Sequence, residues 1–216
     1  MLKQKMMEFH SKTGNQVVLR AIPGHFATSH SHINYYVDMT QLKTRVSEAA
    51  EVAKAFIRML SPHIVVDTIV CMDGSEVIGA YLAEELKKGM YANMNAHDTV
   101  YVVTPEINSN NQLLFRDNLV PEIKGKNILL LLATSTTGMT IDRSLACLDY
   151  YGGKVQAVCS VFSMVDHCGG HEVKSIFTGS DIPGYVAYEA YNCPFCKQKQ
   201  KLDAIVNGYG YSELNY

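Results

Sequence analysis

The 216-residue sequence lacks the marks of several protein classes. No apolar run is long enough to cross a membrane, and residues 1–14 (MLKQKMMEFHSKTG) lack the apolar core of a secretion signal. The formal net charge is only −2, and no basic stripe with interleaved aromatic residues occurs, which argues against nucleic-acid binding by phosphate neutralisation. We therefore expect a soluble, cytoplasmic protein that binds neither nucleic acid nor a membrane.

Cysteines and linkers are also few. Six cysteines in a chain of this size do not indicate a secreted disulfide framework. Cys71 and Cys159 lie in apolar strand patterns and Cys147 lies in a helical pattern, where a reduced, buried thiol is usual. No internal repeat or low-complexity linker divides the chain, so we predict a single domain over residues 1–216.

What the sequence does contain is an alternation of apolar patterns. We expect a short helix over 1–10, a loop from 21 that leads into a strand near 35–39, and an amphipathic helix over 43–60. The patterns then predict strands at 64–71, 99–104, 128–133 and 154–163, with helices at 76–88 and 141–151. This order is typical of an α/β fold with a parallel sheet and helices on both faces. The loops 72–75, 105–118 and 134–140 would then converge at the carboxyl ends of the strands, where such sheets bind ligands.

The most informative stretch is Asn127–Arg143, NILLLLATSTTGMTIDR. A buried strand runs through a hydroxyl-rich turn with one glycine into a helix, which leaves free backbone N–H groups at the helix start. Those groups and the helix dipole suit an anion, so we predict a phosphate-binding loop at Ser135, Thr136, Thr137, Gly138, Met139 and Thr140. The alternative is an ordinary turn in which Thr137 or Thr140 only caps the helix. Asp142, in the first helical turn, is interpreted as a partner of the helix dipole.

Four motifs follow one another along the chain. They are Gly24-His25-Phe26 with Ser29, His32 and Tyr36; Thr136-Thr137-Gly138-Met139-Thr140; Asp166-His167-Cys168-Gly169-Gly170; and Cys193-Pro194-Phe195-Cys196. In their order and spacing they resemble the motifs of the type I phosphoribosyltransferases, and those of the orotate phosphoribosyltransferases most. The match covers about residues 24–196, most of the chain.

The resemblance implies a parallel-sheet core at about 60–165 and a small hood formed by N- and C-terminal segments. It places the N-terminal substrate and hood segment at about 1–45 and a C-terminal appendage at about 166–216. It implies that the Thr136–Thr140 loop holds the 5′-phosphate of phosphoribosyl pyrophosphate and that Asp73, Gly74 and Ser75 form the pyrophosphate loop. His25, Phe26, Ser31 and Tyr36 would form the substrate segment. A homodimer, Mg²⁺ as cofactor and a role in pyrimidine nucleotide metabolism are implied as well.

Three charged features of that family are missing. The two acidic residues that hold the ribose hydroxyls are replaced by Leu132 and Ala133, and the basic residue of the orotate-contacting segment by Ser31. The lysines with which the family's mobile loop neutralises the leaving pyrophosphate are also missing. Between Lys88 and Lys124, Arg116 is the only Lys or Arg, so it is the one candidate for a catalytic loop cation; the alternative is a surface arginine. Asp73 and Glu76 would also repel a pyrophosphate.

These departures leave two hypotheses. In the first, the protein binds a phosphate, nucleotide or phosphoribosyl ligand, with impaired or lost transferase chemistry, as a sensor or a partner subunit. In the second, it is a working phosphoribosyltransferase for orotate or another base, with altered recognition of ribose and pyrophosphate.

A cluster of sulfur and imidazole residues predicts a structural zinc site. Two residues separate Cys168 from His171, and two separate Cys193 from Cys196, a spacing that lets each pair bind the same tetrahedral ion. The alternatives are an exposed reducing pair at 193–196 and unrelated surface residues at 167–171. We interpret His25, His30 and His32 as ligand-contacting or solvated residues rather than metal ligands, because their spacing does not fix a shared face.

Overall fold

The computed structural model describes residues 2–12, 16–88, 99–109 and 112–215. Its larger part is a six-stranded sheet with the order β10-β11-β9-β8-β4-β5. The strands are β4 (Thr68–Cys71), β5 (Tyr101–Val103), β8 (Asn127–Ser135), β9 (Lys154–Ser163), β10 (His167–Cys168) and β11 (His171–Thr178). Every neighbouring pair is parallel except β10 and β11. The predicted parallel α/β sheet is confirmed.

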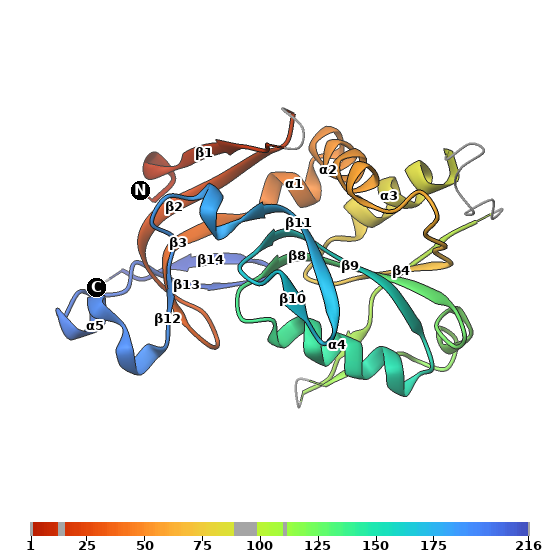
Figure 1. Cartoon of the computed structure of the whole chain (residues 1–216). Helices are drawn as coiled ribbons and strands as arrows, with labels where there is room; N and C mark the ends of the chain where they lie inside the picture. The colour runs from red at the N-terminus through yellow and green to blue at the C-terminus, as the bar shows by residue number, and fades with distance from the viewer. Residues whose placement is uncertain (1, 13–15, 89–98, 110–111, 216) are drawn as a thin grey trace.

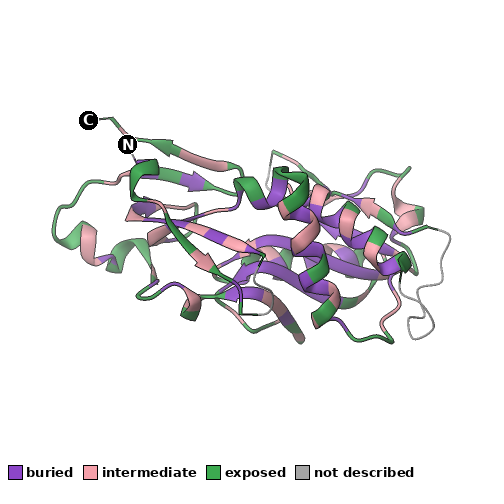
Figure 2. Ribbon diagram, turned by 90° about the horizontal axis from the view of Figure 1, so that it is seen from above, coloured by how far each residue is buried: buried purple, intermediate pink, exposed green. Residues whose placement is uncertain are grey.

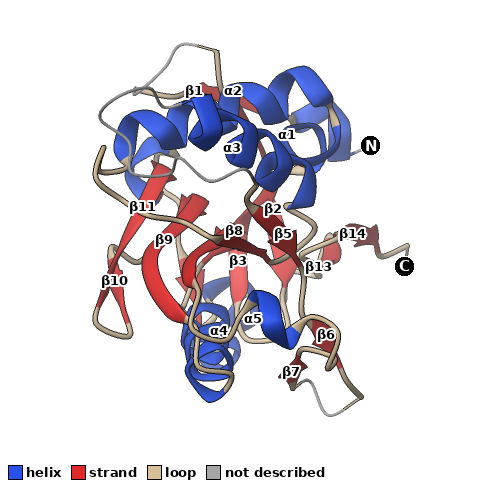
Figure 3. Ribbon diagram, turned by 90° about the vertical axis from the view of Figure 1, so that its right-hand side faces the viewer, coloured by secondary structure: helices blue, strands red, loops and turns tan. Residues whose placement is uncertain are grey.

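The centre of this sheet is β8, and its composition follows from its position. Leu129 and Leu131 belong to one hydrophobic cluster and Leu130 and Leu132 to another, because successive side chains point to opposite faces. Helices α1 (Thr40–Thr44), α2 (Val46–Met59) and α3 (Glu76–Lys88) cover one face, and α4 (Met139–Tyr150) covers the other (Figure 3). A strand covered on both faces requires a continuous apolar run, and each fully buried leucine contributes about 1.5–3 kcal/mol.

Most predicted elements lie within a few residues of their places. The α3 helix and β9 have the predicted bounds, whereas the helix expected over 43–60 is divided at Arg45, whose φ of −87° and ψ of 114° are extended. The remaining short elements are α5 (Pro194–Lys197), the hairpin β6 (Glu106–Ile107) and β7 (Leu113–Leu114), and the 3₁₀ turns η1 (Leu2–Lys5), η2 (Val120–Glu122), η3 (Gly179–Asp181) and η4 (Ala190–Asn192). Among the described residues, no helix has the length and apolarity needed to span a bilayer.

A second sheet forms the hood from both ends of the chain (Figure 1). Its order is β12-β3-β2-β13-β14, and β1 pairs with β2 outside this path. Its strands are β1 (Met7–His10), β2 (Val18–Ala27), β3 (His32–Asp38), β12 (Ala187–Tyr188), β13 (Ala204–Asn207) and β14 (Gly210–Glu213). The predicted hood of N- and C-terminal segments is confirmed.

Three expectations are corrected at the edges of these sheets. The helix expected over 1–10 is a 3₁₀ turn followed by β1. The loop expected from Ala21 is the long strand β2, which accommodates Pro23 and Gly24 through a register irregularity between Pro23 and Phe26. β11, from the segment expected to be an appendage, pairs with β9 and belongs to the core sheet. Figure 2 shows buried residues concentrated in the core strands and in the inner strands of the hood.

Candidate functional site

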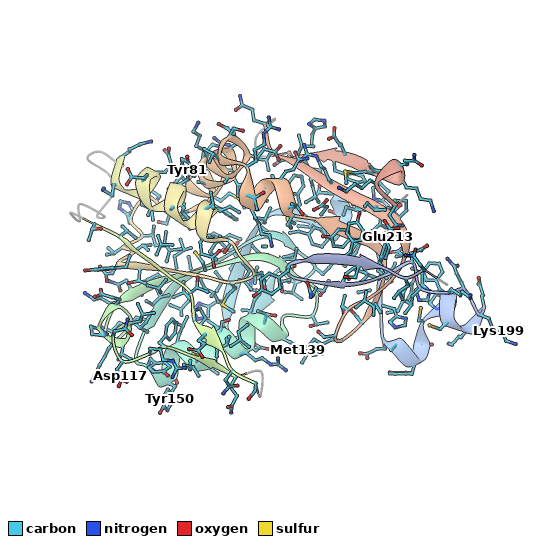
Figure 4. All side chains as sticks on the ribbon, turned by 180° about the vertical axis from the view of Figure 1, so that it is seen from behind. Tyr81, Asp117, Met139, Tyr150, Lys199 and Glu213 are labelled. Carbon is cyan, nitrogen blue, oxygen red and sulfur yellow. The ribbon has the colours of Figure 1, made fainter. Side chains whose placement is uncertain are left out.

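A cavity of about 370 Å³ lies between the carboxyl ends of the core strands and the hood. The hood contributes Thr28–His30, Tyr36 and Asn207–Tyr209, and the core contributes Asp73 and Thr134–Thr140. Ile107 and Leu113 of the β6–β7 hairpin also line it, so the three loops expected to converge do so. In Figure 4, Met139 marks the end of α4 nearer the hood and Tyr150 the far end.

The loop from Thr136 to Thr140 has free backbone amides. Within the described chain, none of these five amides donates a hydrogen bond to a backbone or side-chain acceptor. Gly138, not Thr137 or Thr140, is the N-cap of α4, and no side chain caps the helix. The alternative of a simple capping threonine is therefore wrong, and the amides and the positive end of the helix dipole remain available to an anion.

The backbone conformation at residue 138 explains why this turn contains a glycine. Its φ is +82°, a left-handed conformation that costs other residues about 1–2 kcal/mol. A Cβ here would also meet Cys168 Sγ at 2.9 Å. The Cys168 thiol donates to Asp142 Oδ1 at 3.0 Å, and burial together with the Asp142 carboxylate raises its pKa to about 11. Cys168 therefore packs under the loop as a neutral thiol.

Ser135, directly before the loop, has a buried hydroxyl without a partner. The residue is 4% exposed, and its Oγ makes no hydrogen bond to any described residue. It lines the cavity beside the free amides. A buried polar group without a partner costs about 1–3 kcal/mol, and a ligand oxygen would remove that cost.

Two cations near the cavity were missed by the sequence analysis. Arg143, one turn into α4, lines the cavity, is exposed and forms no ion pair with a described residue. Its place in a helix directly after the predicted phosphate-binding loop was the signal that could have identified it. Lys43 is 7% exposed and lines a small adjoining cavity that shares Tyr36 and Gly208 with the first.

Lys43 ties the turn after β4 to the hood. Its Nζ donates to Asp73 O at 2.7 Å and to Gly208 O at 2.6 Å. Burial lowers the pKa of Lys43 although Asp73 opposes this shift, and burial raises the pKa of Asp73 although Lys43 opposes that one. The hood hairpin lies so close that a Cβ on Gly208 would stand 3.1 Å from Asp73 Oδ1.

In the predicted pyrophosphate loop, Ser75 is engaged by protein groups. Ser75 is buried, its amide donates to Met72 O at 3.1 Å, and its Oγ donates to Leu131 O at 3.2 Å. Of Asp73, Gly74 and Ser75, only Asp73 lines the cavity, and it brings a carboxyl group rather than a cation.

Of the predicted substrate segment, Tyr36 lines the cavity, whereas His25, Phe26 and Ser31 do not. Phe26 is fully buried in the core, and Ser31 Oγ lies 3.0 Å from Thr28 Oγ1. Besides Tyr36, this hairpin brings Thr28, Ser29, His30, Ile33 and Val37 to the cavity.

The charged features that the sequence lacks are not replaced in kind. Leu132 and Ala133 are 0% and 2% exposed, so the positions of the missing acidic pair belong to the core. Arg116 does not line the cavity; its guanidinium forms a bidentate ion pair with Glu106 at 2.7 and 2.8 Å. This geometry favours the surface arginine over the catalytic one.

The predicted zinc ligands are only partly brought together. Cys168 and His171 pair across the β10–β11 hairpin beside α4, far from Cys193 and Cys196 at α5 (Figure 1). The described residues instead place His25 and His32 with Cys193 and Cys196. The predicted ligand set is thus corrected, since the strand pairing of β2 and β3, rather than sequence spacing, sets the partners.

No family model and no curated protein matches the sequence. Solved structures do: Leishmania donovani UMP synthase has a TM-score of 0.54 at 16% identity, over 83% of this chain and 36% of that chain. A phosphoribosyltransferase from Corynebacterium diphtheriae has 0.51 at 16% identity, over 74% and 90%. Mycobacterium tuberculosis orotate phosphoribosyltransferase in complex with 5-phospho-α-D-ribosyl 1-diphosphate has 0.50 at 14% identity, over 68% and 82%. The chain therefore has a type I phosphoribosyltransferase-like fold and spans about a third of the UMP synthase.

Proposed function

We propose that this protein binds a phosphate-bearing small molecule, a nucleotide or a phosphoribosyl compound, and has impaired or lost transferase chemistry. One observation carries the proposal: the unpaired amides of Thr136–Thr140 and the unpartnered Ser135 hydroxyl line one cavity. An anion there accepts several hydrogen bonds at once, each worth about 1.5–3 kcal/mol because the acceptor is charged. The fold supports the same ligand class, since a neighbour at this fold level holds phosphoribosyl pyrophosphate.

The charge balance of the cavity supports binding over transfer. Among the described lining residues, Arg143 is the one Lys or Arg and Asp73 the one carboxylate. Transfer of a phosphoribosyl group requires stabilisation of a departing pyrophosphate, and such charge stabilisation is usually the largest catalytic contribution. Leu132 and Ala133 offer the ribose hydroxyls no acceptor side chain. One arginine suffices to hold a monophosphate but is a weak counter-charge for a leaving pyrophosphate.

The second candidate is a working transferase on orotate or another base, with Mg²⁺ as cofactor. Lys43 favours it, because a buried ammonium 2.7 Å from Asp73 O would become a second cation at the cavity if the hood hairpin moved. The homodimer and the cytoplasmic location expected from the resemblance stay predictions.

Calorimetric titration and a turnover assay on the same preparation test both candidates. Inorganic phosphate, uridine 5′-monophosphate and phosphoribosyl pyrophosphate with Mg²⁺ are titrated separately, and orotate consumption is followed with phosphoribosyl pyrophosphate and Mg²⁺ present. Binding without turnover is the expected result. Turnover at ordinary enzymatic rates, about 1–10³ s⁻¹, would establish the transferase instead. Failure of all three anions to bind would overturn the proposal and leave only the fold.

A further inference from the structure

Four metal-ligating side chains meet at the outer end of the hood, away from the cavity. They are His25 on β2, His32 at the start of β3, Cys193 directly before α5, and Cys196 within α5. Their ligand atoms all lie within 4.8 Å of one another. The two histidines flank the β2–β3 turn and the two cysteines flank the first turn of α5, so each pair is held by local structure. Figure 4 shows this end of the molecule, marked by Lys199, at the far extremity from Asp117.

Four of the six distances between ligand atoms match the edges of a tetrahedral zinc site. Zinc bonds of about 2.0–2.1 Å to nitrogen and 2.3 Å to sulfur give tetrahedral edges of about 3.4 Å between two nitrogens and about 3.6 Å between nitrogen and sulfur. His25 Nε2 and His32 Nδ1 are 3.1 Å apart. The nitrogen–sulfur separations are 3.5 Å (His25–Cys193), 3.7 Å (His25–Cys196) and 3.3 Å (His32–Cys196). Each lies within a few tenths of an ångström of the edge that an ion at the centre would require.

The surroundings of His25 orient its ring for this role. Its Nδ1 lies 3.1 Å from Gln200 O and 3.3 Å from Lys201 O. Carbonyl oxygens only accept hydrogen bonds, so Nδ1 carries the proton and Nε2 presents its lone pair to the cluster. Metal-bound histidines are commonly held in this way by a backbone carbonyl. Asp203 fixes the same backbone, because its Oδ2 accepts from the His25 amide at 2.7 Å.

The donor set distinguishes among metals. Two imidazoles and two thiolates, with no carboxylate in the group, suit Zn²⁺ and disfavour Mg²⁺ and Ca²⁺, which take oxygen ligands. Four protein ligands fill a tetrahedral shell, which is the composition of a structural site rather than a catalytic one. His25 and Cys193 are both 0% exposed, so the ion would be shielded on that side.

We propose that His25, His32, Cys193 and Cys196 bind one structural Zn²⁺ that clips the C-terminal segment to the β2–β3 hairpin. Binding releases the two thiol protons and closes a loop between residues more than 160 positions apart in sequence. The hairpin turn that the ion would brace carries Thr28, Ser29 and His30, which line the cavity. This proposal does not depend on the proposed function, because the ligands lie outside the cavity lining.

Metal content of the untagged protein, purified without chelator, tests the proposal. Elemental analysis should give about one zinc per chain, and removal of the metal with a chelator should lower the melting temperature until Zn²⁺, but not Mg²⁺, is added back. Replacement by cobalt(II) should produce the visible absorption of a tetrahedral thiolate complex. Apoprotein that takes up no zinc from excess Zn²⁺ would overturn the proposal, as would a disulfide between Cys193 and Cys196 in protein kept under thiol reductant.

Matched variants identify the ligands. Cys196→Ser and His32→Ala, at the more exposed half of the cluster, should lower zinc content at least tenfold, whereas Cys168→Ser and His171→Ala should leave it unchanged. The opposite pattern would assign the ion to the other pair and overturn the site. If a variant of the cluster fails to fold, alkylation of wild-type protein decides: Zn²⁺ should protect Cys193 and Cys196 but not Cys168.

Discussion

Two neighbouring turns of the core sheet have the same topology but differ in the side chains and protein contacts that surround them. β4 and β8 are adjacent parallel strands, and each runs through a short turn into a helix. After β8, the amides of Thr136–Thr140 and the Ser135 hydroxyl have no partner among the described residues. After β4, the Ser75 amide and hydroxyl are bonded to Met72 O and Leu131 O.

This difference shows that a strand–turn–helix unit is not by itself an anion site. The β8 turn leaves the Ser135 hydroxyl and five backbone amides without a partner among the described residues. The β4 turn bonds Ser75 internally, presents the Asp73 carboxyl to the cavity and is tied to the hood by Lys43. These contrasts fit the proposed phosphate ligand better than a pyrophosphate donor.

The largest effect is expected from closing the β8 turn. Gly138→Ala forces a side chain into a left-handed residue with Cys168 Sγ 2.9 Å away, so the loop must shift and several amide–anion bonds are lost together. We expect phosphate affinity to fall about a hundredfold or more by calorimetry. Gly125→Ala is the matched control, since its φ is +75° and no atom lies within 4 Å of the added carbon. It should cost similar stability and leave affinity unchanged; equal losses of affinity in both variants would contradict the assignment.

A second prediction separates free from bonded hydroxyls. Ser135→Ala removes a hydroxyl without a partner and should weaken phosphate binding about tenfold to a hundredfold while stability stays the same or rises slightly. Ser163→Ala, at the paired position of β9, removes a hydroxyl that donates to Val165 O and should lower stability but not affinity. Urea unfolding and titration of both variants measure the two effects. Loss of stability in Ser135→Ala with unchanged affinity would remove Ser135 from the site.

Arg143 should contribute a smaller, salt-dependent share. Arg143→Gln is expected to weaken phosphate binding about three- to tenfold at low salt and less at high salt, because an exposed cation is screened. Arg116→Gln is the control, since this arginine is engaged by Glu106 and does not line the cavity. Titrations at two ionic strengths measure both variants. A larger loss of phosphate affinity in Arg116→Gln than in Arg143→Gln would contradict this assignment and identify Arg116 as the functional cation.

The smallest effect is a gain in the β4 turn. Asp73→Asn removes a cavity carboxyl that repels anions, and asparagine tolerates the φ of 56° at this position. Phosphate affinity should rise about two- to fivefold.

The pKa of Asp73 is raised by burial, so its contribution to stability is present below the ordinary value of 3.8 and is lost as pH rises through the raised pKa. Wild type should therefore lose stability relative to Asp73→Asn over that window in urea unfolding; a parallel pH dependence would contradict this.

The sequence predicted the core better than the hood for a physical reason. Core strands and helices bury continuous or periodic apolar faces, so β8, β9 and α3 can be predicted from the local hydrophobic pattern. The hood depends on pairing between the two ends of the chain, as in β2 with β13, and Pro23 and Gly24 obscure β2 locally. Long-range pairing of this kind leaves no periodic signal.

The same distinction applies to the candidate site. The Thr136–Thr140 loop was predictable because strand, turn and helix are consecutive in sequence. The engagement of Ser75, the burial of Lys43 and the meeting of His25 with Cys193 depend on segments far apart in the chain. A single sequence contains the residues that make these contacts but does not show which of them meet in the fold.

The parallel pairing of β2 with β13 also orders events during synthesis on the ribosome. Every strand of the core sheet has been synthesised once Thr178 is made, and the Thr136–Thr140 loop with it. The C-terminal part of the hood wall, Asn207–Tyr209, is made later and is positioned by the pairing of Ala204 and Ile205 with Phe26 and Ala27. A chain that stops before this point contains every core strand but lacks this part of the cavity lining, so binding of the proposed ligand would report that the last strands have docked.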